Sequence, residues 1–489
     1  MNESTTPVLV GIAQVEQRLS EYTPSAKEPV DLMIDALRLA AEDAGAPSLL
    51  TSATSVRVIR GVWPYQNPAS VVAEAVGTPN AETVLTPYGG NYVQTTVNYS
   101  CLDIQQGRHD IILITGGECG NSRAKAQRQG MRAEWRDIPG TPDRMLGEDK
   151  PMAHDFETAI GLRAPIQWYP IFETALRASR GESLDAHIHR IAELWAGFSR
   201  VASTNPHAWL KKPVSAEEIR TLSDSNRGIS YPYPKLMNSN NSVDMGAALI
   251  LTNVATAKKL GISRDKWIYP HVGTDAHDTY FVSNRHSLCE SPAIRVAGRR
   301  ALELADMSAA DVDHVDVYSC FPVAVQVGAM EIGLPLDRPL TVTGGLTFNG
   351  GPLNNYVMHS IARMAEILRE QTGKRGLITA NGGFLTKHAF GVYSSEPPTK
   401  PFQHQDVQAE VDAMPTRDLE SGFMGNARIE GYVVMYGKDG FDAAWAGLLT
   451  ERGTRTWAMT RDQDMMVDMT RNEYVGRTAR VNAEHQFSI

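Results

Sequence analysis

The feature that most constrains this chain is a twofold repeat of the same predicted elements. Strand-sized apolar runs alternate with segments of helical spacing, beginning with VLVGIAQ (8–14) and EPVDLMIDALRLAAEDAG (28–45) and closing with SVDMGAALILTN (242–253). From about residue 266 the order repeats. Each half therefore reads βαβαβαββ, which predicts two mostly parallel sheets whose helices pack on them and on each other.

The second half contains five predicted strands, in the order KWIYPHVGTDAH, HVDVYSC, TVTGGL, RGLITANGG and AFGVYSS. Helices are expected at SPAIRVAGRRALELADM, FPVAVQVGAMEIG and NNYVMHSIARMAEILREQTG. Repetition of a whole element order is a stronger signal than any one element, because chance periodicity does not reproduce it.

Two regions interrupt this pattern. Residues 121–235 mix charged residues with Pro and Trp and are too long for a simple loop, so they predict an inserted subdomain. The Pro-rich run SSEPPTKP marks a linker, after which short strand-like runs separated by KDG and ERG predict a small antiparallel barrel or sheet. The predicted domains are 1–120 with 236–262, 121–235, 263–398 and 399–489.

Charge and composition exclude several classes of function. The net charge is -9, and residues 401–489 hold 14 acidic against 9 basic residues, so nucleic acid is not an expected partner. The N-terminus has neither a signal nor a transit peptide pattern, and no apolar run is long enough to span a membrane. Four cysteines without a CxxC pair suggest neither a zinc site nor a disulfide framework. A cytoplasmic location fits best.

Glycine joins a strand to a helix at two turns, one in each half. The first turn is Gly89-Gly90 before Asn91, and the second is Gly350-Gly351. Glycine allows a ligand to approach the backbone, and free amides at a helix start favour an oxyanion or a carbonyl oxygen. Two tight turns that bind nothing are an equally good explanation of either turn alone.

Taken together, the duplication, the DMGAALIL strand and the segment VDHVDVYSCFPVAVQVGAMEIGL resemble thiolases. The resemblance is to the sterol-carrier-protein branch, and within it to thiolase-like proteins of type 1, which carry an additional C-terminal domain. It covers residues 5 to about 398 and implies a five-layered αβαβα fold. It also implies that the ligand is CoA or an acyl-CoA, with no covalently bound cofactor.

Thiolases place a nucleophilic cysteine at the start of the third helix of the first half. Counting back 28 residues from Glu118, as the family pattern requires, reaches Gly90, and neither Gly89 nor Asn91 supplies a thiol. Glycine cannot form a thioester, so the usual acyl-enzyme chemistry is expected to be lost.

The other three active-site segments are altered as well. Tyr318 and Cys320 stand in the segment that is usually NEAF or HDCF, and Cys320 matches the acid/base cysteine of the sterol-carrier-type enzymes. Gly351 replaces the histidine of the usual GHP segment. Asn381 replaces the cysteine of the usual CxG segment and is followed by Gly382. We therefore expect Cys320, Tyr318 and His388 as candidate acid/base groups, and Gly90, Asn91, Gly350, Gly351, Asn381 and Gly382 around the substrate.

Other side chains have simpler explanations. Cys320 can equally be a small buried residue, and His388 a surface loop residue. His271, His277 and His286 have spacings that suit no closed metal site, so no metal is expected. The basic residues at the start of the insertion could hold the CoA phosphates, although a solvated charged face is simpler.

The leading hypothesis is a CoA or acyl-CoA binding protein of the acetyl-CoA acyltransferase family with little or no ordinary thiolase activity. The first alternative is a non-covalent carbon–carbon lyase of retro-aldol type that acts on a CoA thioester in lipid or sterol breakdown. The second is a non-catalytic CoA sensor or partner subunit. Thiolases usually dimerise near the nucleophile turn, but the added tail and the altered Gly89-Gly90 turn slightly favour a monomer.

Overall fold

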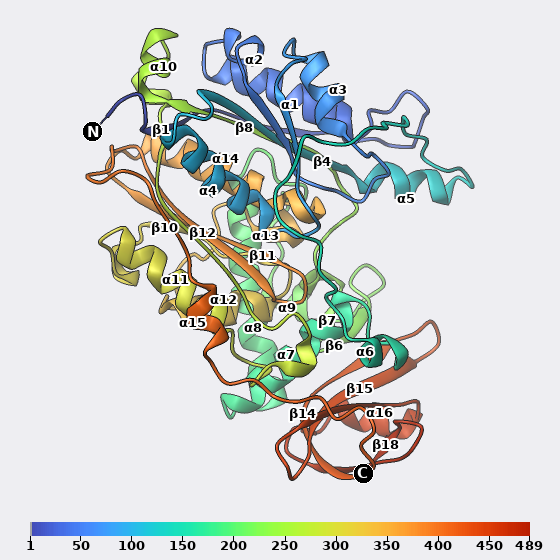
Figure 1. Ribbon diagram of the computed structural model, residues 1–489. Helices are drawn as coiled ribbons and strands as arrows, with labels where there is room; N and C mark the ends of the chain where they lie inside the picture. The colour runs from blue at the N-terminus through green and yellow to red at the C-terminus, as the bar shows by residue number, and fades with distance from the viewer. Residues whose placement is uncertain (1) are drawn as a thin grey trace.

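Two sheets, one from each half of the sequence, form the body of the molecule (Figure 1). The computed structural model describes residues 2–489. The first sheet has six strands in the order β1-β8-β4-β2-β3-β5, in which only β8 runs against its neighbours. Its strands are β1 (Pro7–Glu16), β2 (Ser55–Val58), β3 (Glu82–Leu85), β4 (Ile111–Cys119), β5 (Arg144–Met145) and β8 (Asp244–Asn253).

The second sheet has five strands in the order β10-β11-β12-β9-β13. They are β9 (Tyr269–His277), β10 (His314–Asp316), β11 (Arg375–Gly382), β12 (Lys387–Ser394) and β13 (Gln403–Asp406). Strand β12 is antiparallel to both of its neighbours. The two sheets therefore contain the strands predicted for the two halves, with one exception, and each gains a short edge strand, β5 or β13, from outside its predicted half.

The exception is the segment TVTGGL, for which the prediction of a strand is wrong. Its backbone groups form no ladder with β10, and the backbone bond nearby, from the Val317 amide to the Leu340 carbonyl, lies just outside both segments. The buried carboxylate of Asp316 accepts hydrogen bonds from the amide of Val342 at 3.0 Å and from the hydroxyl of Thr341 at 2.8 Å. The Asp316 side chain thus takes the place of a neighbouring strand as the hydrogen-bond acceptor for this segment. The hydropathy pattern of the segment gives no sign of such a bond.

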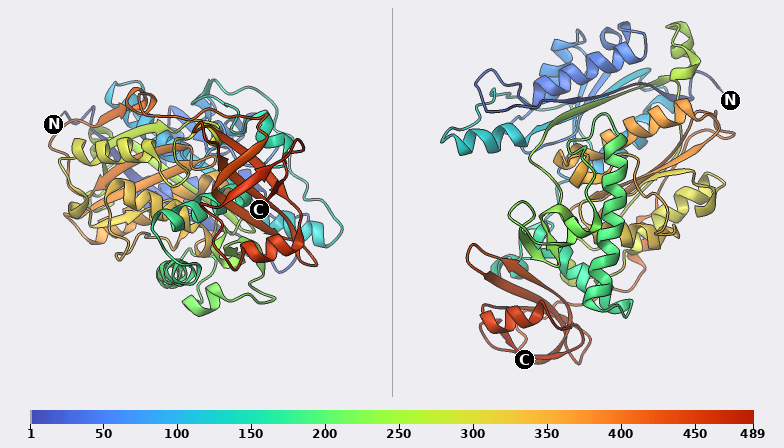
Figure 2. Two further views of the ribbon diagram at one scale, coloured as in Figure 1. Left: turned by 90° about the horizontal axis from the view of Figure 1, so that it is seen from below. Right: turned by 180° about the vertical axis from the view of Figure 1, so that it is seen from behind.

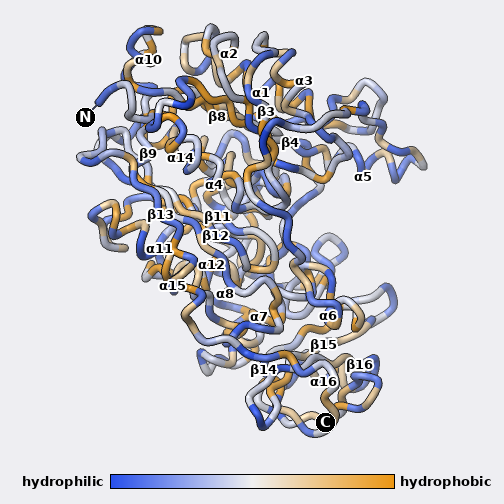
Figure 3. The backbone as a smooth tube through the Cα atoms, viewed as in Figure 1, coloured by the Kyte–Doolittle hydropathy of each residue, from blue (hydrophilic) through white to orange (hydrophobic). Residues whose placement is uncertain are grey.

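Helices complete five layers, as the resemblance implied. α4 and α14 contact strands of both sheets and each other, whereas α1 and α3 cover the outer face of the first sheet and α11 that of the second. α12 packs against α11. Their bounds are α1 (Pro29–Asp43), α3 (Pro68–Ala75), α4 (Tyr92–Gln105), α11 (Pro292–Leu304), α12 (Pro322–Ile332) and α14 (Tyr356–Glu370). β4 and β8 are buried along their whole length and lie in the hydrophobic part of the tube in Figure 3.

The inserted segment is mainly helical. Its elements are α5 (Gly120–Arg128), β5, α6 (Asp155–Ala159), α7 (Pro165–Ser179), α8 (Leu184–Thr204), α9 (Ala216–Arg220), β6 (Gly228–Tyr231) and β7 (Tyr233–Pro234). Trp168 and Trp195 of the long helices α7 and α8 belong to the same hydrophobic core as the second sheet. Apolar burial thereby fixes the insertion against the two-sheet body.

The C-terminal part forms a curled antiparallel sheet that projects from one end of the body (Figure 2). Its strands are β14 (Gly425–Tyr436), β15 (Phe441–Leu449), β16 (Arg455–Thr460), β17 (Thr478–Val481) and β18 (Phe487–Ser488). The sheet order is β16-β15-β14-β17-β18, and its two edge strands approach each other, because Met459 of β16 forms a bridge with Gln486, which directly precedes β18. A separate apolar cluster fills the interior of this curled sheet, which gives it the predicted barrel-like character.

Two strands pair across the predicted domain boundaries. β6, from the insertion, pairs with β14, and β13, from beyond residue 398, pairs with β9. The remaining short elements are α2 (Ser48–Thr51), α10 (Val254–Lys259), α13 (Gly345–Phe348), α15 (Gln408–Asp412), α16 (Gln463–Met469), and the 3₁₀ turns η1 (Lys235–Met237), η2 (Arg264–Lys266), η3 (Val282–Asn284), η4 (Ala309–Asp311) and η5 (Leu353–Asn355).

No helix of residues 2–489 is long and apolar enough to cross a bilayer.

Candidate active site

The turn between β3 and α4 lies at a large cavity. Its volume is about 590 Å³, and among its lining residues are Gly90, Tyr318, Cys320, Asn381 and Gly382. These five candidates come from three separate parts of the chain, and the fold brings them to one place. The cavity is also lined by apolar side chains of α7 and of the loops around it, including Pro165, Ile166, Phe321, Leu346 and Phe384.

Gly90 has no room for a side chain. A Cβ atom built on Gly90 would lie 2.5 Å from the Asn381 carbonyl oxygen and 2.7 Å from the Tyr318 hydroxyl. The space above this residue is therefore occupied by a phenol and by main chain. A cysteine at this position would require backbone movement, because the Asn381 carbonyl belongs to β11 and is not a flexible side chain.

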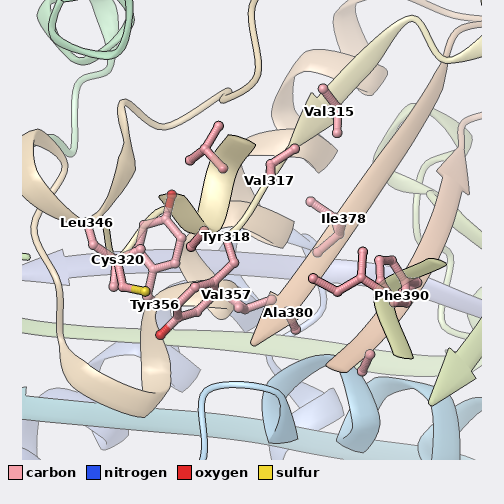
Figure 4. Close-up of a cluster of buried hydrophobic side chains, with 14 of the residues drawn as sticks. Val315, Val317, Tyr318, Cys320, Leu346, Tyr356, Val357, Ile378, Ala380 and Phe390 are labelled. Atoms are coloured by element: carbon pink, nitrogen blue, oxygen red, sulfur yellow. The ribbon is translucent and has the colours of Figure 1, made fainter. Parts of the chain in front are cut away.

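Contacts with Thr379 and Tyr356 fix the position of Tyr318. Its amide donates to the Thr379 hydroxyl at 2.9 Å, and its ring meets the edge of Tyr356 with centroids 5.6 Å apart (Figure 4). Burial raises the pKa of the Tyr318 phenol well above its ordinary value. The phenol therefore keeps its proton at neutral pH and can donate a hydrogen bond to an oxygen of a ligand.

Cys320 lies next to the amide of Asn381, with Sγ and Nδ2 3.9 Å apart. Burial raises the pKa of the Cys320 thiol to about 12, so this side chain is a thiol and not a thiolate at neutral pH. The thiol can donate a hydrogen bond, but it is a weak nucleophile, and its raised pKa makes it a weaker acid than an ordinary cysteine.

Tyr169 of α7 is a cavity residue that the sequence did not single out. Its hydroxyl accepts hydrogen bonds from the Asn381 side-chain amide at 3.0 Å and the Leu385 amide at 2.9 Å. Its ring stacks on Phe321 with centroids 4.4 Å apart. Because Tyr169 belongs to the insertion, no motif of the repeated halves could have identified it.

Lys387 is the second residue missed, although it precedes His388 in the sequence. It is 7% exposed, lines the cavity, and donates to the Tyr88 carbonyl oxygen at 2.5 Å. Burial lowers the pKa of its amine to about 8. A lysine inside an apolar strand is itself an unusual feature, and this was the one available signal.

His388 lies outside the cavity. It is a buried residue of β12 and not a surface loop residue, and it lies 3.5 Å from both Asp278 and Ser291. It lines a second cavity on the other side of Lys387. The sulfur of Cys320 and the hydroxyl of Tyr318 are thus the candidate acid/base groups that share the cavity.

Three other candidates lie beside the cavity without lining it. Asn91 sits between Gly89 and Gly382, since a Cβ on either glycine would come within 2.4 Å of its side-chain oxygen. Gly350 has a positive φ of 107° and packs on Met245. The Gly351 amide donates to the Asn240 carbonyl. The two glycines therefore shape a turn that packs on the first half.

The basic residues at the start of the insertion are partly engaged within the protein. Arg136 pairs with Glu28 and Asp31, and Lys125 donates to the carbonyls of Leu19 and Ser20. Arg128 and Arg132 are exposed. Arg136 and Lys125 are therefore engaged within the protein, whereas Arg128 and Arg132 are accessible to a phosphate group.

Comparison with known proteins agrees with this architecture. Residues 406–486 match the model of the thiolase-like protein type 1 additional C-terminal domain. Over its whole length the chain is 31% identical to a monomeric SCP2-thiolase like protein type 1 from Mycobacterium smegmatis, with 99% of that chain covered and a TM-score of 0.86. The chain belongs to the SCP2-thiolase-like proteins of type 1.

More distant relatives place this family in the thiolase superfamily. An acetyl-CoA acetyltransferase of Methanothermobacter thermautotrophicus is 26% identical over 39% of this chain, which spans about half (54%) of that relative. The Ltp2-ChsH2(DUF35) aldolase has the same fold, with 17% identity, a TM-score of 0.60, and 80% and 98% of the two chains covered.

Proposed function

We propose that this type 1 protein binds CoA or an acyl-CoA in the cavity beside Gly90 and does not perform the ordinary thiolase exchange. The observation that supports this most strongly is the occupied space above Gly90, where the Tyr318 hydroxyl and the Asn381 carbonyl stand in place of a nucleophile. The rest of the cavity keeps a helix start, a phenol and an apolar wall, which suit a thioester.

Calorimetry and a thiolysis assay together test this proposal. CoA and acetoacetyl-CoA should bind with a measurable heat, while acetoacetyl-CoA with CoA should show no loss of enolate absorbance above the uncatalysed rate. An active thiolase under the same conditions is the control. Absence of binding would contradict the proposal as a whole. Turnover at an ordinary thiolase rate would contradict the claim that the protein does not perform the thiolase exchange.

A carbon–carbon lyase without a covalent acyl-enzyme is the second candidate. It is favoured by the Tyr318 hydroxyl, which lines the cavity beside Gly90 and has no hydrogen-bond partner among residues 2–489. Such a phenol can donate a proton to, or stabilise, an enolate oxygen as a carbon–carbon bond breaks. Cys320 is the other proton donor in reach of the cavity.

The lyase test uses a panel of 3-hydroxyacyl-CoA substrates and the variant Tyr318→Phe, which keeps the ring and removes only the hydroxyl. Cleavage by the parent should fall by about 100-fold in the variant while CoA binding is retained. If the parent binds CoA esters but cleaves none, the non-catalytic sensor or partner subunit becomes the better description.

We also infer that the chain is a monomer. β5 pairs in parallel with β3, joining Val84 to Arg144 and Leu85 to Met145, so this edge of the first sheet is covered by the chain itself. The related protein of M. smegmatis is described as monomeric. Light scattering should give the mass of one chain, 53.6 kDa, and twice that value would contradict the inference.

A further inference from the structure

Lys387 opens β12 at the boundary between two cavities. It lines the cavity beside Gly90 and also a second one of about 550 Å³, which lies between α4, β9 and residues 144–150. On the neighbouring strand β11, Lys387 pairs with Gly382. Because Gly382 has no side chain, the methylene chain of Lys387 can extend past it toward the cavity. The amine is therefore buried by its neighbours but in contact with internal space.

Few groups compensate the charge of this amine. Its hydrogen bond to Tyr88 uses one of three N–H donors, and the ring of Tyr92 lies 4.8 Å from Nζ. Among residues 2–489 no carboxylate forms an ion pair with it, and the negative charge of Asp149, which favours the protonated amine, does not offset the effect of burial on its pKa. With a pKa of about 8, roughly one amine in ten is uncharged at pH 7, compared with fewer than one in a thousand for an ordinary lysine.

The amine lies at the turn that would carry the nucleophile in a thiolase. A Cβ on Gly89 would lie 2.8 Å from the Lys387 nitrogen, as a Cβ on Gly90 would lie 2.7 Å from the Tyr318 hydroxyl. A nucleophilic amine and a protonated phenol therefore flank two consecutive residues of one turn. Uncharged lysines in apolar pockets attack carbonyl carbons, and a neighbouring phenol can hold the carbonyl oxygen.

We propose that Lys387 is a carbonyl-reactive amine that forms an imine with the ketone group of a 3-oxoacyl thioester bound in this cavity. The inference rests on the proposed function, since it requires that the thioester binds there. It deepens that function by naming the ligand class, a thioester with a ketone at its third carbon, and the atom that recognises it.

The chemistry balances without an additional reactant. The Lys387 nitrogen forms a bond to the ketone carbon, the carbon–oxygen π bond breaks, and the oxygen takes one hydrogen of the amine to give a carbinolamine. The second amine hydrogen leaves with that oxygen as water, and a carbon–nitrogen double bond remains. Tyr318 donates a hydrogen bond to the oxygen during the addition. The thioester bond is untouched, so the adduct retains CoA.

Reductive trapping tests the proposal on the full-length protein. Acetoacetyl-CoA and sodium cyanoborohydride should give one adduct per chain that retains the CoA mass, and peptide mapping should place it on Lys387. The rate of trapping should rise with pH, with a midpoint near pH 8. Lys387→Arg should lower trapping by at least 100-fold, while Lys374→Arg, at a lysine whose side chain is 51% exposed, should leave it unchanged.

The outcomes separate the two proposals. Failure of acetoacetyl-CoA to bind by calorimetry overturns the proposed function and this inference together. Binding without a reducible adduct on Lys387, or with adducts spread over exposed lysines, overturns the imine alone. An acetoacetyl amide on Lys387 that has lost CoA also overturns it, because the amine would then have attacked the thioester. Mapping of the parent protein requires no variant, so a poorly folding Lys387→Arg does not weaken the test.

Discussion

The two glycine turns occupy equivalent places in the repeated halves but have become different structures. In the first half, β3 is a regular strand paired on both sides, and its turn at Gly89-Gly90 ends at the cavity. In the second half, the equivalent strand is replaced by a loop bound to the Asp316 carboxylate. Topological equivalence therefore predicts where a turn lies, but not whether its glycines line the cavity.

What packs behind each turn explains the difference. In the second half, a Cβ on Gly350 would lie 2.8 Å from the Met245 sulfur and 3.4 Å from the Cβ of Trp209, which belongs to the insertion. The insertion also packs on the loop that leads to this turn, because a Cβ on Gly344 would be 2.4 Å from the Ala202 Cβ of α8. The inserted subdomain thus covers the second turn. The first turn is bordered instead by Tyr318 and Lys387, whose polar ends reach internal space.

Of the changes that test this comparison, removal of the Asp316 carboxylate should have the largest effect on stability. Asp316→Ala leaves the buried donors of Thr341, Val342, Tyr356 and Ser360 without their acceptor. The free energy of unfolding should fall by about 4 kcal/mol in urea denaturation. Asp224→Ala, at an exposed side chain, should change it by less than about 0.5 kcal/mol. A comparably small effect for Asp316 would show that the loop does not depend on it.

Restoring a thiol to the first turn should destabilise the protein without creating a thiolase. Gly90→Cys must displace the Asn381 carbonyl and the Tyr318 hydroxyl, so we expect a loss of about 2 kcal/mol in the free energy of unfolding. Gly422→Cys, where nothing lies within 4 Å of the added Cβ, should be nearly neutral. Ordinary thiolase turnover by Gly90→Cys would show that the site lacks only its nucleophile.

The smallest expected effect concerns the charge of Lys387. Its folded pKa of about 8 lies below its unfolded value, so between these values the unfolded chain binds more protons and this residue makes stability rise with pH. The variant Lys387→Met has no amine at this position, so its stability lacks this rise with pH. Relative to the parent, the variant should therefore lose about 1.5 kcal/mol of stability between pH 7 and pH 10, after allowance for solvent screening. Equal pH profiles would mean that the amine is not desolvated.

Much of the architecture could be predicted because its signals are local. Continuous apolar strands and amphipathic helices define both halves, and the turn signals after residue 425 define the curled sheet. TVTGGL failed because its backbone is satisfied by Asp316, a side chain some 25 residues away in the chain. The strands β5 and β6 were missed because two or four residues carry no periodicity and are stabilised only by their partners.

For the site, the sequence by itself determined which chemical groups are present. It showed a glycine where a thiol is expected, an asparagine in place of a second thiol, and the survival of Cys320. The tertiary structure alone decided how these groups act together, because distances between strands and burial are non-local properties. Only packing places the Tyr318 hydroxyl above Gly90, brings Tyr169 to Asn381 from the insertion, turns His388 away, and desolvates the amine of Lys387.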